Sequence, residues 1–375
     1  MPDTTQVQPP AEDIAYKRIC VVGGGAWGTA LASVARHAGR DVSLWCRSEE
    51  VAAAICEHSE NPRYLKGIKL ASGIKATTDL AAALHDSEAV LLITPSDSIR
   101  EMTRAIAPLT ATDCPIFTGA KGIEAGSGLL MTGIMAEEAP GRVIGAISGP
   151  TFAVETAADQ PTAVTIACTS RGTEAQHMAA ARMAATLTTD SFRPYISDDL
   201  TGVEIGGAMK NVIAIACGML HGAGYGENLR AALITRGLAE IKELAVTMGG
   251  SRETVTGLSG IGDLMLTCSS PKSRNFSYGT QRGQGLSDAE VFEGRPVVVE
   301  GRTNAVTVTD LARTKGLHMP ICEMVRSIVS DGHKIGDAFA DYWSAPIEGE
   351  PRALSFKIKH PAATAAHTRF GGPRP

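Results

Sequence analysis

The sequence predicts an α/β protein in which a doubly wound, mainly parallel sheet is followed by an all-helical domain. Short, apolar, β-rich runs alternate with helical stretches through the first half of the chain. A glycine-rich turn directly follows the first of these runs, and strand signals nearly vanish after about residue 199. Strands that alternate with helices indicate βαβ units, whose strands pair in parallel.

Each predicted element rests on a local pattern. The β-rich runs predict strands over 19–22, 41–46, 89–94, 115–119, 143–148, 162–168 and 192–196. In the second half, helical periodicity of the apolar residues predicts helices over 205–219, 230–248 and 303–314. We therefore expect a disordered lead-in over 1–15, a sheet domain over 16–200 and a helical domain over 201–344. The tail over 345–375, which is rich in Pro, Ala, Gly and basic residues, is expected to be disordered or an extension on the surface.

The composition is typical of a cytoplasmic globular enzyme. The 375 residues, 44% of them hydrophobic, suffice for two or three domains with a substantial core. A net charge of −5 gives no reason to expect nucleic acid or an anionic membrane surface as a partner. No apolar stretch reaches transmembrane length, and the polar, acidic N-terminus does not look like a secretory signal. The eight cysteines form no C-x-x-C or Cys/His cluster, so we expect no metal site. Cys20, Cys168, Cys217 and Cys322 lie in apolar runs and are expected to be buried thiols.

The strongest local motif is G-x-G-x-x-G over residues 23–28, placed between a predicted strand and a predicted helix. Gly23 makes the tight turn, Gly25 lets the backbone approach a pyrophosphate, and Gly28 packs the helix against the strand. The helix N-terminus adds N–H groups and a partial positive charge for the phosphates. Such a motif alone is weak in a chain with 40 glycines, but this placement predicts a Rossmann-like dinucleotide-binding domain.

The residue that ends the second predicted strand bears on the choice of dinucleotide. NAD-binding domains usually have Asp or Glu there, whereas an arginine accommodates the 2′-phosphate of NADP(H). This chain has Arg47, which favours NADP(H). Glu49 and Glu50 lie next to it, so NAD(H) stays open, and a solvated arginine is the alternative.

Ligands of doubly wound sheets gather outside the carboxyl ends of the strands. Several predicted strands end there in small polar residues or a charge, at Pro95 and Ser96, at Lys121 and over residues 148–153. Lys121 is the most informative of these, because a lysine at that place can reach a phosphate or a carbonyl oxygen. A solvated loop cation is the alternative.

Lys210 is the only charged residue in the run 205–219. A lysine on a buried helix face loses hydration, which disfavours its charged form and lowers its pKa toward the range useful for proton transfer. Gly206, Gly207 and Ala214 leave room for a ligand against the same helix face. We interpret Lys210 as catalytic; the alternative is a lysine that extends its ammonium group to the surface.

Two further segments of the helical half carry candidate residues. Asp263 stands in a glycine-rich, apolar setting, where it is either a helix N-cap or the group that orients a catalytic lysine. Arg274 lies between Ser273 and Asn275, and arginine beside hydroxyl and amide groups suits a phosphate held by two hydrogen bonds. A solvated loop is the alternative for this second segment.

Over residues 18–342 these motifs resemble the bacterial NAD(P)-dependent glycerol-3-phosphate dehydrogenases. The glycine motif is shared by many dehydrogenases, whereas the lysine, aspartate and Ser-Arg-Asn segments in this order are far more specific. The sequence departs from the family's pattern at Lys66, where proline is frequent, and in its long C-terminal extension. The matching segments are 23–31, 61–65, 118–123, 148–153, 208–212, 260–264, 273–275 and 298–301.

The resemblance implies reversible reduction of dihydroxyacetone phosphate to sn-glycerol 3-phosphate with NADP(H) or NAD(H), by a cytoplasmic homodimer that supplies phospholipid synthesis. It implies that Lys210 donates or accepts the proton, that Lys121 lies near cofactor and substrate, and that Asp263 orients Lys210. The substrate-contact positions that match are Lys121, Gly149, Thr151, Lys210, Asn211, Asp263, Thr267, Ser273, Arg274 and Asn275. The cofactor-contact positions that match are Gly23, Gly25, Ala26, Trp27, Gly28, Arg47, Lys121, Ala153, Arg274, Val298 and Glu300.

Other functions share some of these features. A related 3-hydroxyacid or phosphogluconate dehydrogenase would have the same lysine and nucleotide-binding domain, but its substrates carry a carboxylate. A non-enzymatic dinucleotide sensor would bind NADPH without consuming it and needs no buried lysine. The single charge within an apolar helix argues against a helical interaction module.

Overall fold

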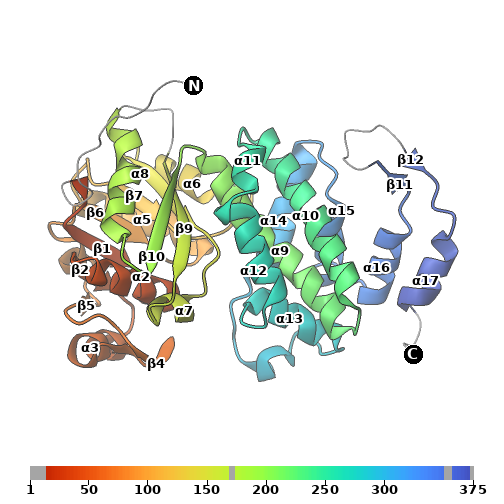
Figure 1. Ribbon diagram of the computed structural model, residues 1–375, viewed down its shortest axis with the longest axis horizontal. Helices are drawn as coiled ribbons and strands as arrows, with labels where there is room; N and C mark the ends of the chain where they lie inside the picture. Colours follow the sequence, from red (N-terminus) through yellow and green to blue (C-terminus); the bar gives the residue numbers. More distant parts are fainter. Residues whose placement is uncertain (1–13, 169–173, 350–356, 372–375) are drawn as a thin grey trace. The chain divides into compact units, whose positions relative to one another are not determined.

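A computed structural model describes residues 14–168, 174–349 and 357–371 (Figure 1). The chain forms two compact units: unit 1 comprises residues 1–207 and 245–266, and unit 2 comprises 208–244 and 267–375. The sequence predicted a single boundary between residues 200 and 201. The observed boundary lies further along helix α9 (Leu200–Gly222), because Leu200 and Val203 pack against Ala146 and Ala167 of the sheet.

Unit 1 contains the predicted sheet, which has eight strands among the described residues, in the order β10-β9-β8-β7-β6-β1-β2-β5. Neighbouring strands are parallel, except that β8 and β9 are antiparallel. The strands are β1 (Arg18–Val22), β2 (Asp41–Trp45), β5 (Lys75–Thr77), β6 (Ala89–Leu92), β7 (Ile116–Thr118), β8 (Ile144–Ser148), β9 (Thr162–Cys168) and β10 (Phe192–Ser197). The prediction missed β5, a short polar edge strand, and the separate antiparallel pair β3 (Glu60–Asn61) and β4 (Leu65–Lys69).

Helices cover both faces of the sheet, as parallel strands require (Figure 1). Ile19 and Val21 of β1 enter the core on one face, and Cys20 and Val22 enter the core on the other. The first core includes α2 (Ala26–His37), α3 (Glu49–His58), α7 (Ala153–Ala157) and α8 (Glu174–Leu187), and the second includes α4 (Leu80–Leu84), α5 (Ile99–Ile106) and α6 (Met131–Glu138). Unit 1 also holds α11 (Arg252–Val255) and the π-helical turn η3 (Leu258–Gly262).

Unit 2 is helical, as predicted, apart from the two-residue antiparallel strands β11 (Ile347–Glu348) and β12 (Lys357–Ile358) among its described residues. Its helices are the later part of α9, α10 (Glu227–Thr247), α12 (Asp263–Ser269), α13 (Arg274–Gly283), α14 (Glu300–Thr314), α15 (Pro320–Val329), α16 (Ile335–Trp343) and α17 (Ala363–Gly371). The division between the units falls inside α9, α10 and α12.

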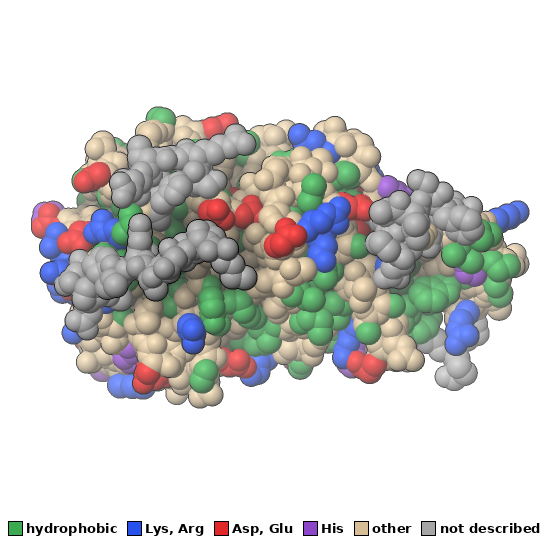
Figure 2. All heavy atoms as spheres, turned by 45° about the horizontal axis from the view of Figure 1, so that its top comes forward, with side chains coloured by type: hydrophobic (Ala, Val, Ile, Leu, Met, Phe, Trp, Pro, Cys, Tyr) green, Lys and Arg blue, Asp and Glu red, His purple; other side chains and the backbone are tan. Residues whose placement is uncertain are grey.

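Two features of the structure concern the expectations about nucleic acid and membranes: the charges on the surface and the longest described helix. On the face drawn in Figure 2, basic and acidic side chains are interspersed. One helix among the described residues, α9, is long and apolar enough by length and composition to cross a membrane. The whole of its apolar window is buried inside the protein, as is usual for a core helix.

Glycines bring α9 and α13 into backbone contact within unit 2. Gly218 and Gly222 are one turn apart on α9, and Gly279 and Gly283 are one turn apart on α13. A Cβ atom at Gly279 would stand 2.2 Å from the carbonyl oxygen of Ile215, and a Cβ atom at Gly222 would stand 1.9 Å from that of Thr280. The helices therefore approach more closely than any larger residue at these positions permits.

Of the two alternatives for the tail after residue 345, disorder is wrong for the part of the tail that the structure describes. This part contains β11, β12 and α17, and α17 packs along α16. The ring centroid of Phe370 lies 5.2 Å from that of Tyr225 and 6.0 Å from that of Trp343. The polar and small residues of the tail obscured this apolar face, which is buried only by packing on the rest of unit 2. Residues 350–356, 372–375 and most of the predicted lead-in lie outside the described residues.

Replacing Gly279 by alanine tests the contact between α9 and α13. We expect Gly279→Ala to destabilise the protein by ~1–3 kcal/mol, because the added methyl group overlaps the backbone of α9. That loss corresponds to a Tm lower by several degrees. Gly133→Ala is the control, because Gly133 is also helical but its nearest neighbour would be at an ordinary 3.5 Å. Equal Tm values for the two variants would show that the close approach is not tight in solution.

Candidate active site

The carboxyl ends of parallel strands in unit 1 meet at one edge of the sheet. β8, β7, β6, β1 and β2 are neighbours in that order and run in the same direction. The strand order reverses at β1, and such a switch point is where doubly wound sheets bind ligands. Predicted site residues follow four of these strands: Gly23 after β1, Arg47 after β2, Lys121 after β7 and Gly149 after β8.

The turn after β1 has the geometry that a dinucleotide-binding loop needs. Gly23 has a φ of +131°, and a Cβ atom there would stand 2.1 Å from the carbonyl oxygen of Ile93. A Cβ atom at Gly28 would stand 1.9 Å from the carbonyl oxygen of Gly23, so helix and strand pack closely here. At Gly25 nothing lies within 4 Å of the Cβ position, which leaves the backbone open to a ligand. No side chain caps the N-terminus of α2, as expected where an anion binds.

Arg47 is exposed just beyond β2, and its polar neighbours have roles in α3. The Ser48 hydroxyl accepts a hydrogen bond from the backbone N–H of Val51 and caps this helix. Glu49 and Glu50 lie in its first turn, where carboxylates interact favourably with the helix dipole. Glu49 and Glu50, which left the choice between NADP(H) and NAD(H) open, are therefore explained by their favourable position at the start of α3.

Lys121 forms an ion pair with Asp263. The lysine Nζ lies 2.5 Å from the carboxylate Oδ2, and the side chains are 17% and 1% exposed. Asp263 is the first residue of α12, and the two residues are 142 positions apart in the chain. Of the two interpretations of Asp263, the contact favours the one in which it orients a lysine. The lysine in this contact is Lys121, and a role of Asp263 toward Lys210 stays a prediction.

Two buried hydroxyls at this edge of the sheet, Thr94 Oγ1 and Ser148 Oγ, have no hydrogen-bond partner among the described residues. Ser148 ends β8, and its hydroxyl lies 3.3 Å from the Cβ position of Gly207. The Lys121 Cγ lies 3.2 Å from the same position, so both side chains border one glycine. A buried polar atom without a partner is costly, and a ligand at this edge would supply one.

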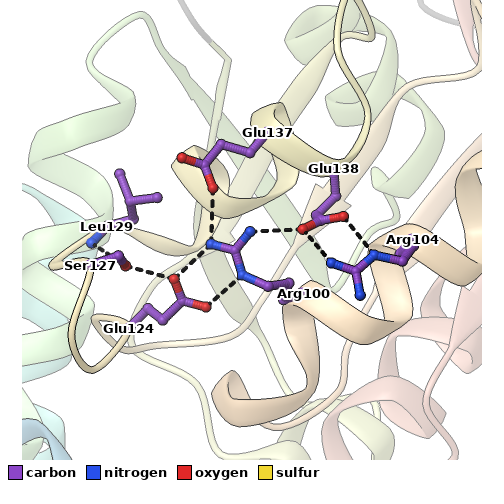
Figure 3. Close-up of polar contacts among 7 residues, drawn as sticks. All are labelled: Arg100, Arg104, Glu124, Ser127, Leu129, Glu137 and Glu138. Carbon is purple, nitrogen blue, oxygen red and sulfur yellow. Dashed lines mark hydrogen bonds and ion pairs between the residues drawn. The ribbon is translucent and has the colours of Figure 1, made fainter.

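The segment that carries Lys121 is anchored on both sides. Before the lysine, the Cβ position of Gly119 lies 3.0 Å from the Trp27 indole nitrogen, so these residues are in contact. After it, the carboxylate of Glu124 pairs with the Arg100 guanidinium of α5 at 2.7 Å (Figure 3). Hydrogen bonding to Arg100 lowers the pKa of Glu124 to about 2, so this carboxylate is charged at neutral pH.

Glu204 of α9 caps the helix that follows this segment. Its carboxylate accepts hydrogen bonds from the backbone N–H of Thr132, at 2.9 Å, and from the hydroxyl of Thr132, at 2.5 Å. Thr132 lies in the first turn of α6, and Leu130 at the N-cap position provides no side-chain cap. Glu204 is only 7% exposed. Burial raises its pKa from the usual 4.5 to about 7, although the hydrogen bonds from Thr132 oppose the shift.

In unit 2, Lys210 is buried, as the catalytic interpretation requires. Its side chain sits in α9 with 7% exposure, and its Nζ donates a hydrogen bond to the hydroxyl of Thr267 at 3.0 Å. Thr267 is itself 5% exposed and was among the predicted substrate contacts. The alternative, in which Lys210 extends to the surface, is wrong.

Three other predicted residues share one hydrogen-bond network in unit 2. The Asn211 Nδ2 donates to Glu300 Oε2 at 3.0 Å, and the Asn275 Nδ2 donates to Asn211 Oδ1 at 2.9 Å. The Asn275 Oδ1 accepts from the backbone N–H of Gly301 at 2.9 Å. This network joins α9, the start of α13 and the start of α14 through side chains predicted for substrate and cofactor.

The remaining predicted residues have simpler environments. The Ser273 hydroxyl is the N-cap of α13 and accepts from the N–H of Phe276, whereas Arg274 beside it is exposed. Val298 is 55% exposed just before α14. In unit 1, the Thr151 hydroxyl donates to the carbonyl of Gly149 at 3.4 Å, Ala26 opens α2 and Ala153 opens α7. The predicted site residues are therefore divided between the two units.

The sequence analysis gave no role to three buried polar residues that hold segments carrying predicted site residues. They are Asn61, Glu204 and Asn304, whose amide donates to the carbonyl of Ala208 in α9 at 2.9 Å. An acid at the start of an apolar run was a local signal for Glu204, and Asn61 stood in a segment that matched the family. Their partners, however, lie far away in the chain and leave no local pattern.

Glu204 makes stability depend on pH in a direction that can be measured. The folded state binds its proton more tightly than the unfolded state, so this group's contribution to stability is full below about pH 4.5 and is lost as the pH rises through about 7. We expect the Tm of Glu204→Gln, relative to wild type, to rise between pH 5 and pH 8. Glu57→Gln, at an exposed glutamate of α3, is the control. A constant difference for Glu204→Gln would contradict the assigned pKa.

Comparisons with known proteins confirm the resemblance. Residues 18–174 match the family model of the NAD-dependent glycerol-3-phosphate dehydrogenase N-terminus, and residues 199–340 match that of the C-terminus. Glycerol-3-phosphate dehydrogenase (NAD(P)+) of Parvibaculum lavamentivorans is 47% identical over 337 residues, which are 90% of this chain and 99% of that protein. The corresponding protein of Rhodospirillum rubrum is 45% identical over 348 residues, covering 93% and 97% of the two chains. The crystal structure of glycerol-3-phosphate dehydrogenase from Coxiella burnetii is 35% identical, with a TM-score of 0.80, and covers 87% of this chain and 98% of that one. This chain belongs to the NAD-dependent glycerol-3-phosphate dehydrogenase family.

Proposed function

We propose that this protein interconverts dihydroxyacetone phosphate and sn-glycerol 3-phosphate with NADP(H) or NAD(H). The observation that carries the proposal is the edge of the sheet in unit 1, where the glycine loop, Arg47 and the Lys121–Asp263 pair follow neighbouring strands. Family membership supports the choice of reaction. The role in the cell is the supply of glycerol 3-phosphate for phospholipid synthesis, by a cytoplasmic homodimer.

The open backbone at Gly25, the uncapped N-terminus of α2 and the unsatisfied hydroxyl of Thr94 fit a dinucleotide at this edge. When bound, the nicotinamide supplies or accepts the hydride. Arg47 is proposed to hold the 2′-phosphate of NADP(H), because a guanidinium suits a phosphate and no acid stands at this position. The residues proposed to contact the cofactor are Gly23, Gly25, Ala26, Trp27, Gly28, Arg47, Lys121, Ala153, Arg274, Val298 and Glu300.

Lys210 and Lys121 suit the chemistry at the substrate carbonyl. Negative charge grows on the carbonyl oxygen during reduction, and a cationic donor stabilises it more in the transition state than in the ground state. Lys210 is proposed to give the oxygen its proton in reduction and to take it back in oxidation. Lys121 is proposed to contact the substrate, held in place by Asp263. The other proposed substrate contacts are Gly149, Thr151, Asn211, Thr267, Ser273, Arg274 and Asn275, with Arg274 binding the phosphate.

Removing the Lys210 amine tests its part in proton transfer. We expect Lys210→Ala to lower kcat by roughly 10²–10⁴, because a positioned acid–base group contributes that much. The Kd for NADPH, measured by fluorescence titration, should stay close to the wild-type value. Lys315→Ala, at an exposed lysine after α14, is the control and should retain full turnover. Normal turnover of Lys210→Ala would remove this lysine from the chemistry.

Comparing the two cofactors tests Arg47. Wild-type protein with dihydroxyacetone phosphate should oxidise NADPH faster than NADH, as followed by absorbance of the reduced nicotinamide. Arg47→Ala should raise the KM for NADPH about tenfold, since a charge-assisted hydrogen bond is lost, and leave the KM for NADH unchanged. NADH is thus the internal control. Equal rates with both cofactors in the wild-type protein would keep the reaction but remove this role of Arg47.

A further inference from the structure

Asn61 is a fully buried polar residue that touches the glycine loop. It ends the short strand β3 and is 0% exposed. Its Nδ2 donates to the carbonyl oxygen of Gly24 at 3.1 Å and to the hydroxyl of Thr29 at 2.9 Å. Gly24 lies inside the glycine loop and Thr29 in the first turns of α2, so one amide group holds both parts of the nucleotide-binding motif.

The other side of the Asn61 amide has partners that set its orientation. Its Oδ1 accepts from the backbone N–H groups of Arg63, at 3.3 Å, and Tyr64, at 3.1 Å. A rotated amide would place its oxygen against the Gly24 carbonyl and its NH₂ group against these two N–H donors. The segment 61–64 therefore presents the NH₂ group toward the loop in one orientation.

The contact with Gly24 has a consequence for the next residue. The carbonyl of Gly24 and the N–H of Gly25 belong to one planar trans peptide, so they point in opposite directions. When Asn61 binds the carbonyl, the Gly25 N–H is turned away from the interior. Gly24 also packs closely against Cys46, just beyond β2, because a Cβ atom at Gly24 would stand 2.2 Å from the Cβ of Cys46. Gly25 is the residue at which the backbone is open to a ligand.

We propose that Asn61 is a positioning residue for the dinucleotide, which sets affinity for the pyrophosphate by holding the Gly24–Gly25 peptide in its binding orientation. This inference rests on the proposed function insofar as the ligand of the loop is NADP(H) or NAD(H). Asn61 acts through Gly24 and does not touch the reacting atoms.

Asn61→Asp is the most direct test, because aspartate has the same shape and still accepts from the N–H groups of Arg63 and Tyr64. It replaces the NH₂ donor by an oxygen that faces the Gly24 carbonyl. We expect the Kd and KM for NADPH to rise about tenfold or more, since two acceptors then face each other in a buried place. At saturating NADPH, kcat and the KM for dihydroxyacetone phosphate should match wild type. A purely structural role would lower the Tm and leave the Kd and KM for NADPH unchanged, and this outcome overturns the proposal.

Thr29 accepts the second hydrogen bond of the Asn61 NH₂ group, so variants of Thr29 test the hold on this amide without altering Asn61. Thr29→Val removes the hydroxyl that accepts from Asn61 and keeps the shape of the side chain, whereas Thr29→Ser keeps the hydroxyl. The Kd for NADPH should rise severalfold in Thr29→Val and return to the wild-type value in Thr29→Ser. If Asn61→Asp does not fold, this pair decides the question, and equal Kd values for both variants overturn the proposal.

Direct titration with NADPH separates this proposal from the proposed function. Wild-type protein that binds NADPH but does not oxidise it with dihydroxyacetone phosphate would refute the proposed reaction, while the Asn61 and Thr29 series would still decide the role of Asn61. Wild-type protein that oxidises NADPH, with variants that bind it equally well, would refute only the role of Asn61.

Discussion

The burial of α9 is the constraint on which the rest of the structure depends. A buried helix must find a partner for each polar side chain that it carries, because an unsatisfied buried group costs ~1–3 kcal/mol and an unpaired charge costs more. Glu204, Lys210 and Asn211 are the groups concerned. Their partners are Thr132 in α6, Thr267 in α12, Asn275 in α13 and Glu300 in α14. Each of these bonds holds part of another helix against α9, and two of the three side chains, Lys210 and Asn211, also have a proposed role at the substrate.

The glycines of α9 act together with these polar contacts. Close backbone packing brings α13 against α9, and the same approach puts Asn275 at the start of α13 within hydrogen-bond distance of Asn211. Gly301 is similarly close, since a Cβ atom there would stand 2.5 Å from the carbonyl oxygen of Asn211. The glycines therefore allow α9 and α13 to pack closely, and the hydrogen bond between Asn211 and Asn275 fixes how the two helices are aligned along each other. Together they align the starts of α13 and α14 with the middle of α9.

In unit 1 the edge proposed to bind the dinucleotide is held by residues that are not themselves proposed to contact it. Asn61 holds the glycine loop, Ser48 caps α3 beside Arg47, and the Arg100–Glu124 pair anchors the segment that carries Lys121. The unpartnered hydroxyls of Thr94 and Ser148 lie in the same rigid frame. These supports are contacts within the protein that restrict the segments at this edge, and a smaller loss of conformational freedom on binding favours affinity and alignment.

The sequence by itself determined the class of fold, most strands, the glycine loop, the burial of Lys210 and the family, because each leaves a pattern within a few consecutive residues or matches a known motif. Periodicity marks buried faces, and a lone charge in an apolar run marks a buried charge. Only the tertiary structure decided which groups meet: Lys121 with Asp263, Glu204 with Thr132, and Asn61 with Gly24. It also showed that segment 245–266 belongs to unit 1 and that the tail contains helix α17. These features depend on partners tens to hundreds of residues away, and a partner at such a distance imposes no local pattern on the chain.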